Sequence, residues 1–454
     1  MSGAAPRITI VGGGLAGSEA AWQVARRGFA VDLWEMRPQV STEAHQSAMF
    51  GELVCSNSLR DDSLLTAVGL LKREMRAMGS LILRVAEETR VPAGSALAVD
   101  RVRFAERITA AIESLPGVAI HRGEITSIPA GGIVILATGP LTSPALSSEL
   151  ASFVGSDHLY FYDAISPILT ADSIDMNVAF KAARWGKGGD DYINCPLDRE
   201  QYERLVDEIL AADKMPMKSF ERCIHFEGCM PVEEIARRGR NTLAFGPMRP
   251  VGLIDPRSGR RAHAVVQLRQ DDTEGRLFSM VGFQTKMTYP EQRRVFRMIP
   301  GLQGAEFVRL GSLHRNTFIN SPKALRPTLQ AKSRDDLFIA GQLVGVEGYV
   351  ESTATGLLAG INAVRIAGGQ HAIAPPQATS LGSLLAYITD RQRSDFQPMN
   401  ANYGLFPPLD GRLRGRDKKE AMAARADLEF TEWVRSSALD AAPVADARAA
   451  IAAG

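Results

Sequence analysis

The stretch that decides the fold is Arg7-Ile8-Thr9-Ile10-Val11-Gly12-Gly13-Gly14-Leu15-Ala16-Gly17, followed by a helical composition to Arg27 and a second apolar run that ends at Glu35. The residues before the glycines predict a short β-strand, and Gly28 is expected to end the helix. A strand, a Gly-x-Gly-x-x-Gly turn, a helix and an acidic residue on the next strand form, in this order, the dinucleotide-binding βαβ unit. The sequence therefore predicts a bound dinucleotide.

Each part of this unit has a physical role. Gly12 permits a tight turn, Gly14 lets backbone amides approach a pyrophosphate, and Gly17 lets the helix pack closely on the strand. The phosphates then lie at the positive N-terminus of the helix, and the carboxylate of Glu35 binds the ribose hydroxyls. The expected cofactor-binding residues of this unit are Gly12, Gly13, Gly14, Leu15, Ala16, Gly17 and Glu35.

Two later apolar runs indicate that the same domain resumes after a long interruption. Residues 133–139 end in Ala-Thr-Gly, and residues 336–341 end in Ile-Ala-Gly. Runs that are apolar on both faces are typical of parallel strands, and ligands bind where such strands end. Thr138, Gly139, Gly341 and Gln342 are therefore expected to line the same crevice as Gly12. This pattern predicts an α/β fold in which a doubly wound, Rossmann-type FAD-binding domain is interrupted by an inserted α+β domain.

The expected boundaries follow from these runs and from the composition between them. Residues 1–164 form the first part of the FAD-binding domain, and residues 165–334, rich in arginine and in Gly/Pro turns, form the inserted domain. Residues 335–454 complete the FAD-binding domain. After about Ala421 the chain becomes rich in alanine, which predicts a helix and a frayed tail.

The composition excludes several classes of protein. Of the 454 residues, 45% are hydrophobic and 23% charged, which is ordinary for a globular enzyme. The four cysteines contain no CxxC pair, so neither a disulfide scaffold nor a zinc site is expected, and reduced thiols in the cytoplasm are the natural interpretation. Because the first strand begins at Arg7, we expect no signal peptide, and no apolar run approaches the ~18 residues of a membrane helix.

Basic residues are concentrated in the middle of the chain. The net charge is only +1, but residues 218–334 hold 21 Lys and Arg against 10 Asp and Glu. Such a surplus is typical of a lobe that binds a polyanion, although solvated helix faces would account for it equally well.

Two cysteines lie in unusual sequence contexts. Cys55 belongs to the polar cluster 52–59, and Cys229 lies in a loop bounded by glycine and proline within the basic region. A thiolate near arginines is a good nucleophile, but most cysteines are buried and inert, so both readings stay open at this point. Cys195 and Cys223 carry less context and are expected to be structural.

Several segments, spread over almost the whole chain, carry a resemblance to a known family. They are residues 11–20, 52–59, 192–196, 226–231, 314–322, 340–342 and 345–349. On these segments the chain closely resembles the TrmFO family, the folate- and FAD-dependent methyltransferases that make 5-methyluridine in the T-loop of bacterial tRNA. Many flavoproteins share the glycine loop, whereas the two cysteine segments and residues 314–322 are far more specific.

The resemblance implies a chemistry. FAD occupies the split Rossmann domain, methylenetetrahydrofolate supplies the one-carbon unit, and NADH or NADPH supplies electrons through the flavin for methylation at tRNA position 54. Cys229 matches the cysteine that attacks uracil, and Cys55 matches a second catalytic cysteine close to the flavin. Glu347, Gly348 and Tyr349 are expected to cover the isoalloxazine, although Tyr349 fits a core position equally well. No second Gly-x-Gly-x-x-Gly unit is present, so the nicotinamide is expected to bind only transiently.

tRNA and folate are the expected partners, with no membrane and no stable protein partner. Five arginines of the basic region are expected to contact tRNA phosphates, namely Arg237, Arg238, Arg240, Arg260 and Arg261. Alternatives are the same chemistry on ribosomal RNA or a flavin-dependent wobble-uridine enzyme of the MnmG type, which would be longer. A generic thiol or nicotinamide oxidoreductase would show CxxC or a second nucleotide motif, and a flavin-bearing RNA-binding protein would leave the cysteines idle.

Overall fold

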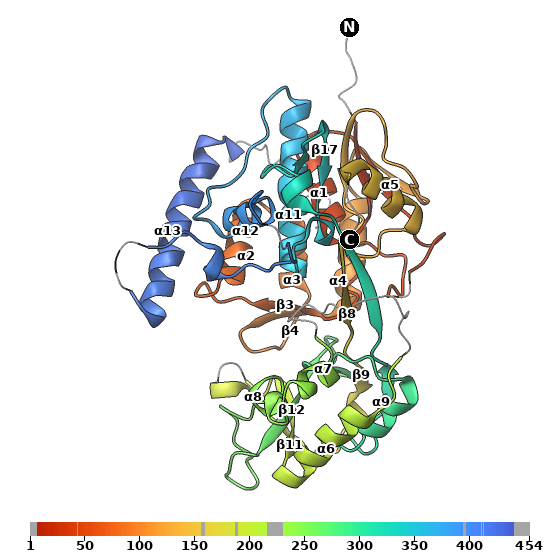
Figure 1. Cartoon of the computed structure of the whole chain (residues 1–454), viewed down its shortest axis with the longest axis vertical. Helices are drawn as coiled ribbons and strands as arrows, with labels where there is room; N and C mark the ends of the chain where they lie inside the picture. The colour runs from red at the N-terminus through yellow and green to blue at the C-terminus, as the bar shows by residue number, and fades with distance from the viewer. Residues whose placement is uncertain are drawn as a thin grey trace.

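The chain folds into two lobes that an antiparallel ribbon connects (Figure 1). The computed structural model describes residues 7–42, 44–155, 159–186, 189–215, 230–393, 396–409, 411 and 413–439, and for residues 159–163 and 313–315 only the backbone is considered. The first lobe contains the chain up to residue 155 and again from residue 319. The inserted lobe (residues 165–310) lies between these two parts in the sequence and below them in Figure 1.

A six-stranded sheet forms the centre of the first lobe. Its order is β16-β17-β7-β1-β2-β6, and all pairs except β16–β17 are parallel. Parallel pairing requires long crossovers between neighbouring strands, and here α1 fills the crossover from β1 to β2. The strands are β1 (Ile8–Val11), β2 (Val31–Glu35), β6 (Val118–Arg122), β7 (Ile133–Leu136), β16 (Gln330–Ala331) and β17 (Arg334–Ile339).

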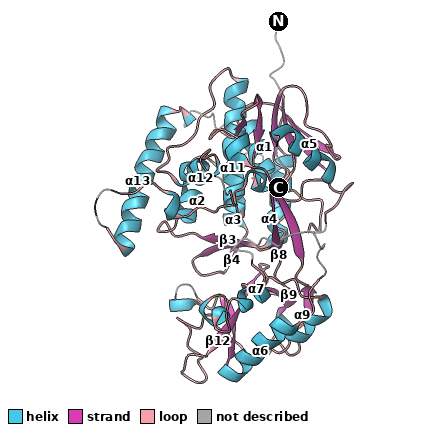
Figure 2. Cartoon of the chain, in the orientation of Figure 1, coloured by secondary structure: helices cyan, strands magenta, loops and turns pink. Residues whose placement is uncertain are grey.

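Helices dominate the rest of the first lobe (Figure 2). They are α1 (Leu15–Ala25), α2 (Ala67–Ala77), α3 (Leu81–Glu88), α4 (Arg101–Glu113), α5 (Pro144–Val154), α10 (Ser321–Ala324), α11 (Tyr349–Ala367), α12 (Ser380–Ile388) and α13 (Gly415–Ser436). A small antiparallel sheet of β3 (Ser58–Asp61), β5 (Ala96–Val99) and β4 (Arg90–Val91) lies on the side that faces the inserted lobe (Figure 1).

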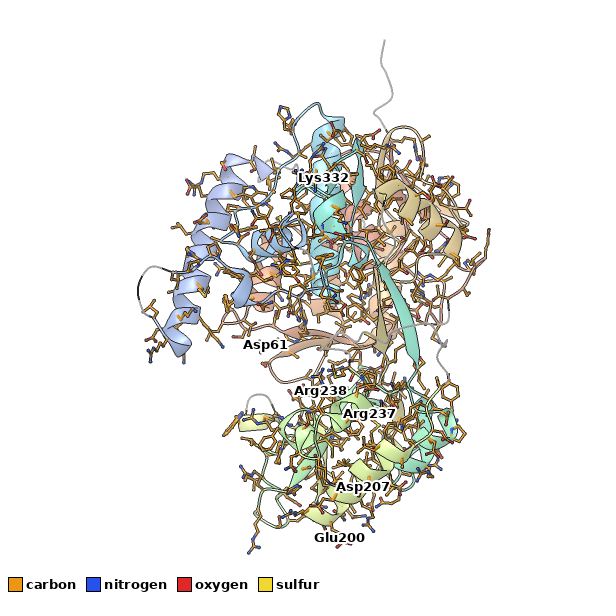
Figure 3. All side chains as sticks on the ribbon, viewed as in Figure 1. Asp61, Glu200, Asp207, Arg237, Arg238 and Lys332 are labelled. Atoms are coloured by element: carbon orange, nitrogen blue, oxygen red, sulfur yellow. The ribbon has the colours of Figure 1, made fainter. Side chains whose placement is uncertain are left out.

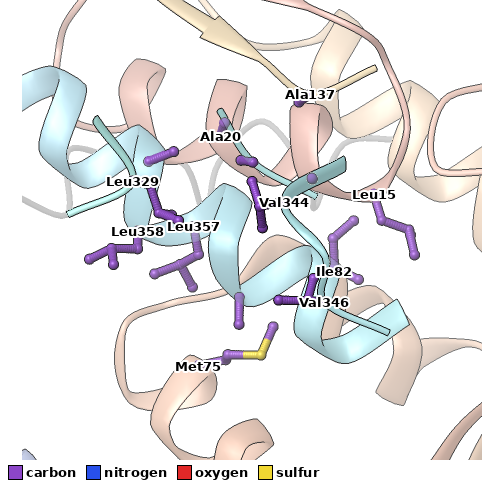
Figure 4. Close-up of a cluster of buried hydrophobic side chains, with 14 of the residues drawn as sticks. Leu15, Ala20, Met75, Ile82, Ala137, Leu329, Val344, Val346, Leu357 and Leu358 are labelled. Atoms are coloured by element: carbon purple, nitrogen blue, oxygen red, sulfur yellow. The ribbon is translucent and has the colours of Figure 1, made fainter. Parts of the chain in front are cut away.

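The core of the first lobe is built where α1 meets α11. Leu15, Ala20, Val344 and Leu357 are among its buried side chains (Figure 4). A Cβ atom on Gly356 of α11 would lie 2.2 Å from the carbonyl oxygen of Ala16, so only glycine allows the two helix backbones to approach this closely. Helix α11 comes more than 320 residues after α1, yet its packing fixes the position of the glycine loop.

The inserted lobe has its own core around an antiparallel sheet of order β10-β11-β12-β13-β9-β14. Its strands are β9 (Ile168–Thr170), β10 (Phe180–Lys181), β11 (Tyr192–Leu197), β12 (Ala264–Gln270), β13 (Leu277–Met280) and β14 (Phe307–Arg309). Its helices are α6 (Arg199–Ala211), α7 (Val232–Arg237), α8 (Thr242–Phe245) and α9 (Tyr289–Phe296). The connecting ribbon consists of β8 (Leu159–Ala164) and β15 (Leu313–Phe318).

The two cores locate the return of the chain earlier than the boundary at residue 334 that the sequence suggested. Ile319, Leu325, Leu329 and Ala331 are buried in the first core, and β16 pairs with β17. These residues therefore belong physically to the first lobe. The ribbon brings the chain back to the first lobe at Phe318. Residues 319–331, which show little strand periodicity of their own, therefore contribute to the core of that lobe.

The C-terminal helix α13 covers α2, and residues 440–454, for which we expected a frayed tail, lie outside the described part of the chain. Among the described residues, no helix has the length and apolar character that a membrane span requires.

Candidate functional site

A cavity opens at the carboxyl ends of β1, β2 and β7. Many of the residues expected to bind the cofactor line it: Gly12, Gly14, Leu15, Ala16, Glu35, Thr138, Gly139, Gly341, Gln342 and Tyr349. The fold therefore brings together three segments that lie more than 100 residues apart in the sequence.

The glycine loop forms the floor of this cavity. Gly12 has φ +104°, which side-chain-bearing residues rarely adopt, and a Cβ atom on Gly17 would lie 1.8 Å from the carbonyl oxygen of Gly12. Gly14 is the N-cap of α1, and no side chain caps the helix there. The first amides of α1 are thus available to a phosphate group, which the helix dipole attracts.

Glu35 lies at the end of β2 and is 5% exposed. Its Oε2 accepts the N–H of Gly13 at 2.8 Å, and its Oε1 accepts the Nε–H of Arg37 at 2.8 Å. Burial opposes ionisation, but these hydrogen bonds and the charge of Arg37 together lower the pKa of Glu35 below its ordinary value. An ionised carboxylate of this kind suits the hydroxyls of a ribose. Arg37, which also pairs with Glu52 at 3.2 Å, carries no motif that would identify it from the sequence.

Four of the expected cofactor residues do not line the cavity. Gly13 packs under the ring of Phe50, and Gly17 packs against the glycine loop itself. Glu347 is buried and accepts a hydrogen bond from Gln342 at 2.8 Å, and Gly348 forms the N-cap of α11. These four residues pack behind the residues that line the cavity and support them.

Tyr349 joins the cavity to Cys55. Its Oη lies 3.0 Å from Sγ of Cys55 and accepts the backbone N–H groups of Cys55 (2.8 Å) and Ser56 (3.2 Å). A hydroxyl oxygen has two acceptor positions and one proton. Since the two amides occupy both acceptor positions, the proton of Tyr349 is directed to Sγ. Burial, and then the negative charge of an ionised Cys55, raises the pKa of Tyr349 well above its ordinary value, so this hydroxyl remains a donor.

Three arginines surround the Cys55 segment. Arg101, the first residue of α4, donates to the carbonyl of Leu53 at 2.5 Å, and Arg269 of β12 donates to the side chains of Asn57 (2.9 Å) and Ser56 (2.8 Å). Arg309 of β14 donates to the carbonyl of Ala44 at 3.3 Å.

The guanidinium charges act on the thiol. Burial lowers the pKa of Arg269 and of Arg309, whereas an ionised Cys55 would raise both. By reciprocity these cations favour the thiolate form of Cys55. Two of the three arginines come from the inserted lobe, so the environment of Cys55 is complete only when both lobes are in place.

The remaining cysteines differ in their surroundings. Cys195 is fully buried in β11, and burial raises its pKa to about 12, in keeping with the structural role expected for it. Cys229 and Cys223 lie outside the described residues. In the part of the chain that the structure describes, no group of His, Cys, Asp and Glu side chains could hold a metal ion.

The structure disperses the five arginines expected to bind tRNA. Arg237 and Arg238 lie on the side of the inserted lobe that faces the first lobe (Figure 3). Arg237 pairs with Glu234 at 2.8 Å, and Arg240 pairs with Asp207 at 2.8 Å. Arg260 and Arg261 are exposed before the start of β12, at the opposite end of that strand from Arg269. These arginines are close together in the sequence, but they do not share one surface of the inserted lobe.

Comparisons with known proteins agree with this architecture. Residues 7–371 match the family model described as glucose inhibited division protein A, GIDA. Two crystal structures of GidA from Aquifex aeolicus superpose with a TM-score of 0.67 over 94% of this chain, at 17% and 18% identity, and thereby show a shared fold. The alignments cover 73% and 76% of those chains.

Much closer relatives are known by sequence. The methylenetetrahydrofolate--tRNA-(uracil-5-)-methyltransferase TrmFO of Geobacter sulfurreducens is 58% identical over 435 residues, which cover 96% of this chain and 99% of that protein. The protein of the same name from Moorella thermoacetica is 58% identical over 421 residues, covering 92% and 96%. With this identity over nearly the full length and the GidA-like fold, the chain belongs to the TrmFO family.

Proposed function

We propose that this chain transfers the one-carbon unit of methylenetetrahydrofolate to C5 of a uracil in tRNA and that it uses FAD in doing so. The proposal is supported by the activity named for relatives that are 58% identical over nearly the whole chain. The structural observation that carries it is the contact between Cys55 and Tyr349 at the wall of the cavity that the glycine loop lines. We further propose that the target is the uridine at position 54 in the T-loop and that the enzyme acts in the cytoplasm.

The residues of the cavity fit FAD. The uncapped N-terminus of α1 would hold the pyrophosphate, and Glu35 would hold the ribose of the adenosine half. Thr138, Gly139, Gly341 and Gln342 would line the remainder, with Tyr349 at its end. When bound and reduced, the flavin supplies the two electrons that convert a methylene group to a methyl group. NADH or NADPH is the proposed source of these electrons and would visit the site transiently.

The uracil requires activation by a nucleophile, and we assign this role to Cys229. Its Sγ adds to C6, which turns C5 into a nucleophilic enolate carbon that can take up the one-carbon unit. The base must be turned out of the T-loop stack before a thiol can reach it. Arg237, Arg238, Arg240, Arg260 and Arg261 are proposed to hold the tRNA through its phosphates, from more than one side of the inserted lobe.

Cys55 is proposed to move a proton at the end of this sequence. Once C5 carries the new carbon, its hydrogen must leave as a proton while the C5=C6 double bond forms and the bond from C6 to Cys229 breaks. A thiolate at Cys55 can take that proton, and Cys229 then departs as a thiolate. The hydrogen bond from Tyr349 and the neighbouring arginines keep Cys55 in the form that this step needs.

A methylation assay tests the activity. The purified protein is incubated with unmodified tRNA, FAD, NADPH and methylenetetrahydrofolate, and 5-methyluridine is measured by nucleoside mass spectrometry. We expect the product with methylenetetrahydrofolate and none with S-adenosylmethionine as the sole donor. The reverse pattern, or a colourless protein that binds no FAD, would refute the proposal.

A second assay separates the two cysteines. A T-loop hairpin that carries 5-fluorouridine should form a covalent adduct with the parent protein and with Cys55→Ala, because attack at C6 does not need Cys55. Cys229→Ala should form none. An undiminished adduct with Cys229→Ala would remove that residue from the nucleophile role.

A further inference from the structure

A second, more open cavity lies between the inserted lobe and the loop that borders the FAD cavity. From the inserted lobe, Tyr289 and Arg293 of α9 and Arg309 of β14 line it. From the first lobe, Gln46 lines it, whereas the preceding residue, His45, lines the FAD cavity. A single turn of loop thus separates the two cavities.

This loop is held between the two lobes. Arg309 donates to the carbonyl of Ala44 at 3.3 Å, and the N–H of Gln46 donates to Oε1 of Glu52 at 2.7 Å. Glu52 in turn pairs with Arg37 at 3.2 Å, inside the FAD cavity. The wall between the cavities is therefore fixed by hydrogen bonds from both sides.

The second cavity contains two arginines for which the described residues provide no ion pair. Among the described residues, neither Arg293 nor Arg309 has a carboxylate within ion-pair distance, and the hydrogen bonds of both go to backbone carbonyls. Burial lowers the pKa of Arg309 and the charge of Arg101 lowers it further, whereas negative charge on Tyr349, Cys55 and Glu52 opposes the shift without reversing it. A partly buried guanidinium beside another cation is costly unless an anion neutralises it. Arginine also binds carboxylates in bidentate fashion.

The neighbouring arginine provides a direct contrast. Arg294, next to Arg293 on α9, pairs with Glu291 at 2.7 Å and with Glu208 at 2.5 Å, and it does not line the cavity. The charge of Arg294 is thus neutralised on its own lobe, whereas the guanidinium groups of Arg293 and Arg309 form no ion pair with any described residue.

We propose that the second cavity binds the acidic end of methylenetetrahydrofolate, with Arg293 and Arg309 contacting the glutamate carboxylates and the ring of Tyr289 packing on the benzoyl group. This inference rests on the proposed function. The donor must present its one-carbon end in the FAD cavity, and its glutamate carboxylates lie at the other end of the molecule, beyond the benzoyl group. A cationic cavity one loop away from the FAD cavity offers these carboxylates a place to bind.

Arg293→Gln tests the proposal, with Arg294→Gln as the matched control on the same helix. Hydrogen bonds to charged groups contribute about 1.5–3 kcal/mol, which corresponds to roughly 10- to 100-fold in affinity. In the methylation assay we therefore expect Arg293→Gln to raise the KM for methylenetetrahydrofolate triglutamate by about this factor. The kcat and the KM for tRNA should stay within about twofold of the parent values, and Arg294→Gln should change none of the three.

A probe without the pterin isolates the cavity from the chemistry. p-Aminobenzoyl-triglutamate should bind the FAD-loaded protein in calorimetric titrations, whereas p-aminobenzoate, which lacks the glutamates, should not. Arg309→Gln and Arg293→Gln should each weaken this binding, and Arg309→Lys should restore part of it.

The outcomes are separable. If Arg293→Gln raised the KM for tRNA but not for folate, the cavity would be a phosphate site and the proposal would be wrong. Equal effects of Arg293→Gln and Arg294→Gln would show a general effect of surface charge, and no effect of either would also overturn it. If the parent protein did not methylate tRNA at all, the proposed function would fail, and the calorimetric titrations would still decide whether the cavity takes glutamate carboxylates.

Discussion

Replacing Tyr349 by phenylalanine removes one oxygen atom that serves three groups. The ring remains to fill the wall of the FAD cavity, but Cys55 Sγ loses its donor, and the amides of Cys55 and Ser56 lose their acceptor. A hydrogen bond to a charged group contributes about 1.5–3 kcal/mol. The thiolate population of Cys55 near neutral pH should therefore fall roughly 10- to 100-fold. The two amides belong to half-buried residues, so we expect a further loss of about 1–3 kcal/mol in the free energy of unfolding.

Alkylation kinetics measure this effect on the FAD-loaded protein. Iodoacetamide reacts with thiolates, and peptide mass spectrometry follows Cys55 separately from the other cysteines. Cys195 serves as an internal reference, because it is buried and its pKa is raised to about 12, so it should stay unmodified while the protein is folded. We expect alkylation of Cys55 at pH 7 to slow by about 10- to 100-fold in Tyr349→Phe, with FAD retained and turnover reduced.

Tyr387→Phe is the matched control. Tyr387, on α12, is buried in the first lobe, and its hydroxyl donates to the carbonyl of Gln397 at 3.0 Å, away from Cys55. Equal slowing in both variants, or an unchanged rate in Tyr349→Phe, would refute the assignment of Tyr349 as donor. A difference in the alkylation rate of Cys55 that persists at pH 10 would also refute this assignment. An ordinary thiol is largely ionised at that pH, so the remaining difference would reflect how accessible Cys55 is to the reagent.

Further predictions concern the nucleotide unit and one buried lysine. Gly14→Ala should fold normally but bind FAD poorly, because its Cβ atom would meet no protein atom within 4 Å and would point into the cavity. Gly17→Ala should instead lower the melting temperature, because its Cβ atom would lie 1.8 Å from a backbone oxygen. Measurements of FAD content and of thermal unfolding distinguish the two variants. Glu35→Gln should cost about 3 kcal/mol of unfolding free energy in urea and weaken FAD binding, since it leaves the buried Arg37 with Glu52 alone; an unchanged stability would contradict the ion-pair argument. Burial lowers the pKa of Lys72 to about 8, so between about pH 8 and 10.5 the unfolded chain holds more protons than the folded one, and stability should rise with pH by on the order of 1–3 kcal/mol. Lys72→Met should remove this slope, and parallel slopes in the parent and the variant would show that Lys72 is not its source.

The interactions around Cys55 show why much of the site could not be read from the sequence. Tyr349 follows Cys55 by nearly 300 residues, and Arg101, Arg269 and Arg309 come from one helix and two strands of different lobes. None of these residues forms a local motif, because their proximity depends on how the inserted lobe docks on the first. The second cavity is of the same kind, since Gln46 of the first lobe joins lining residues that come from near residues 289–312.

What the sequence alone determined is the nucleotide-binding unit and the fold class. The Gly-x-Gly-x-x-Gly turn, the strands that are apolar on both faces and the acid at residue 35 are local patterns, and the parallel sheet with its GidA-like topology agrees with them. What only the tertiary structure decided is where the inserted lobe ends, which arginines form no ion pair within the described part of the chain, and which group donates to Cys55. The physical reason is one of range: backbone geometry and helix dipoles act within a few residues, whereas the charge and hydrogen bonding of a thiol depend on whatever long-range packing places beside it.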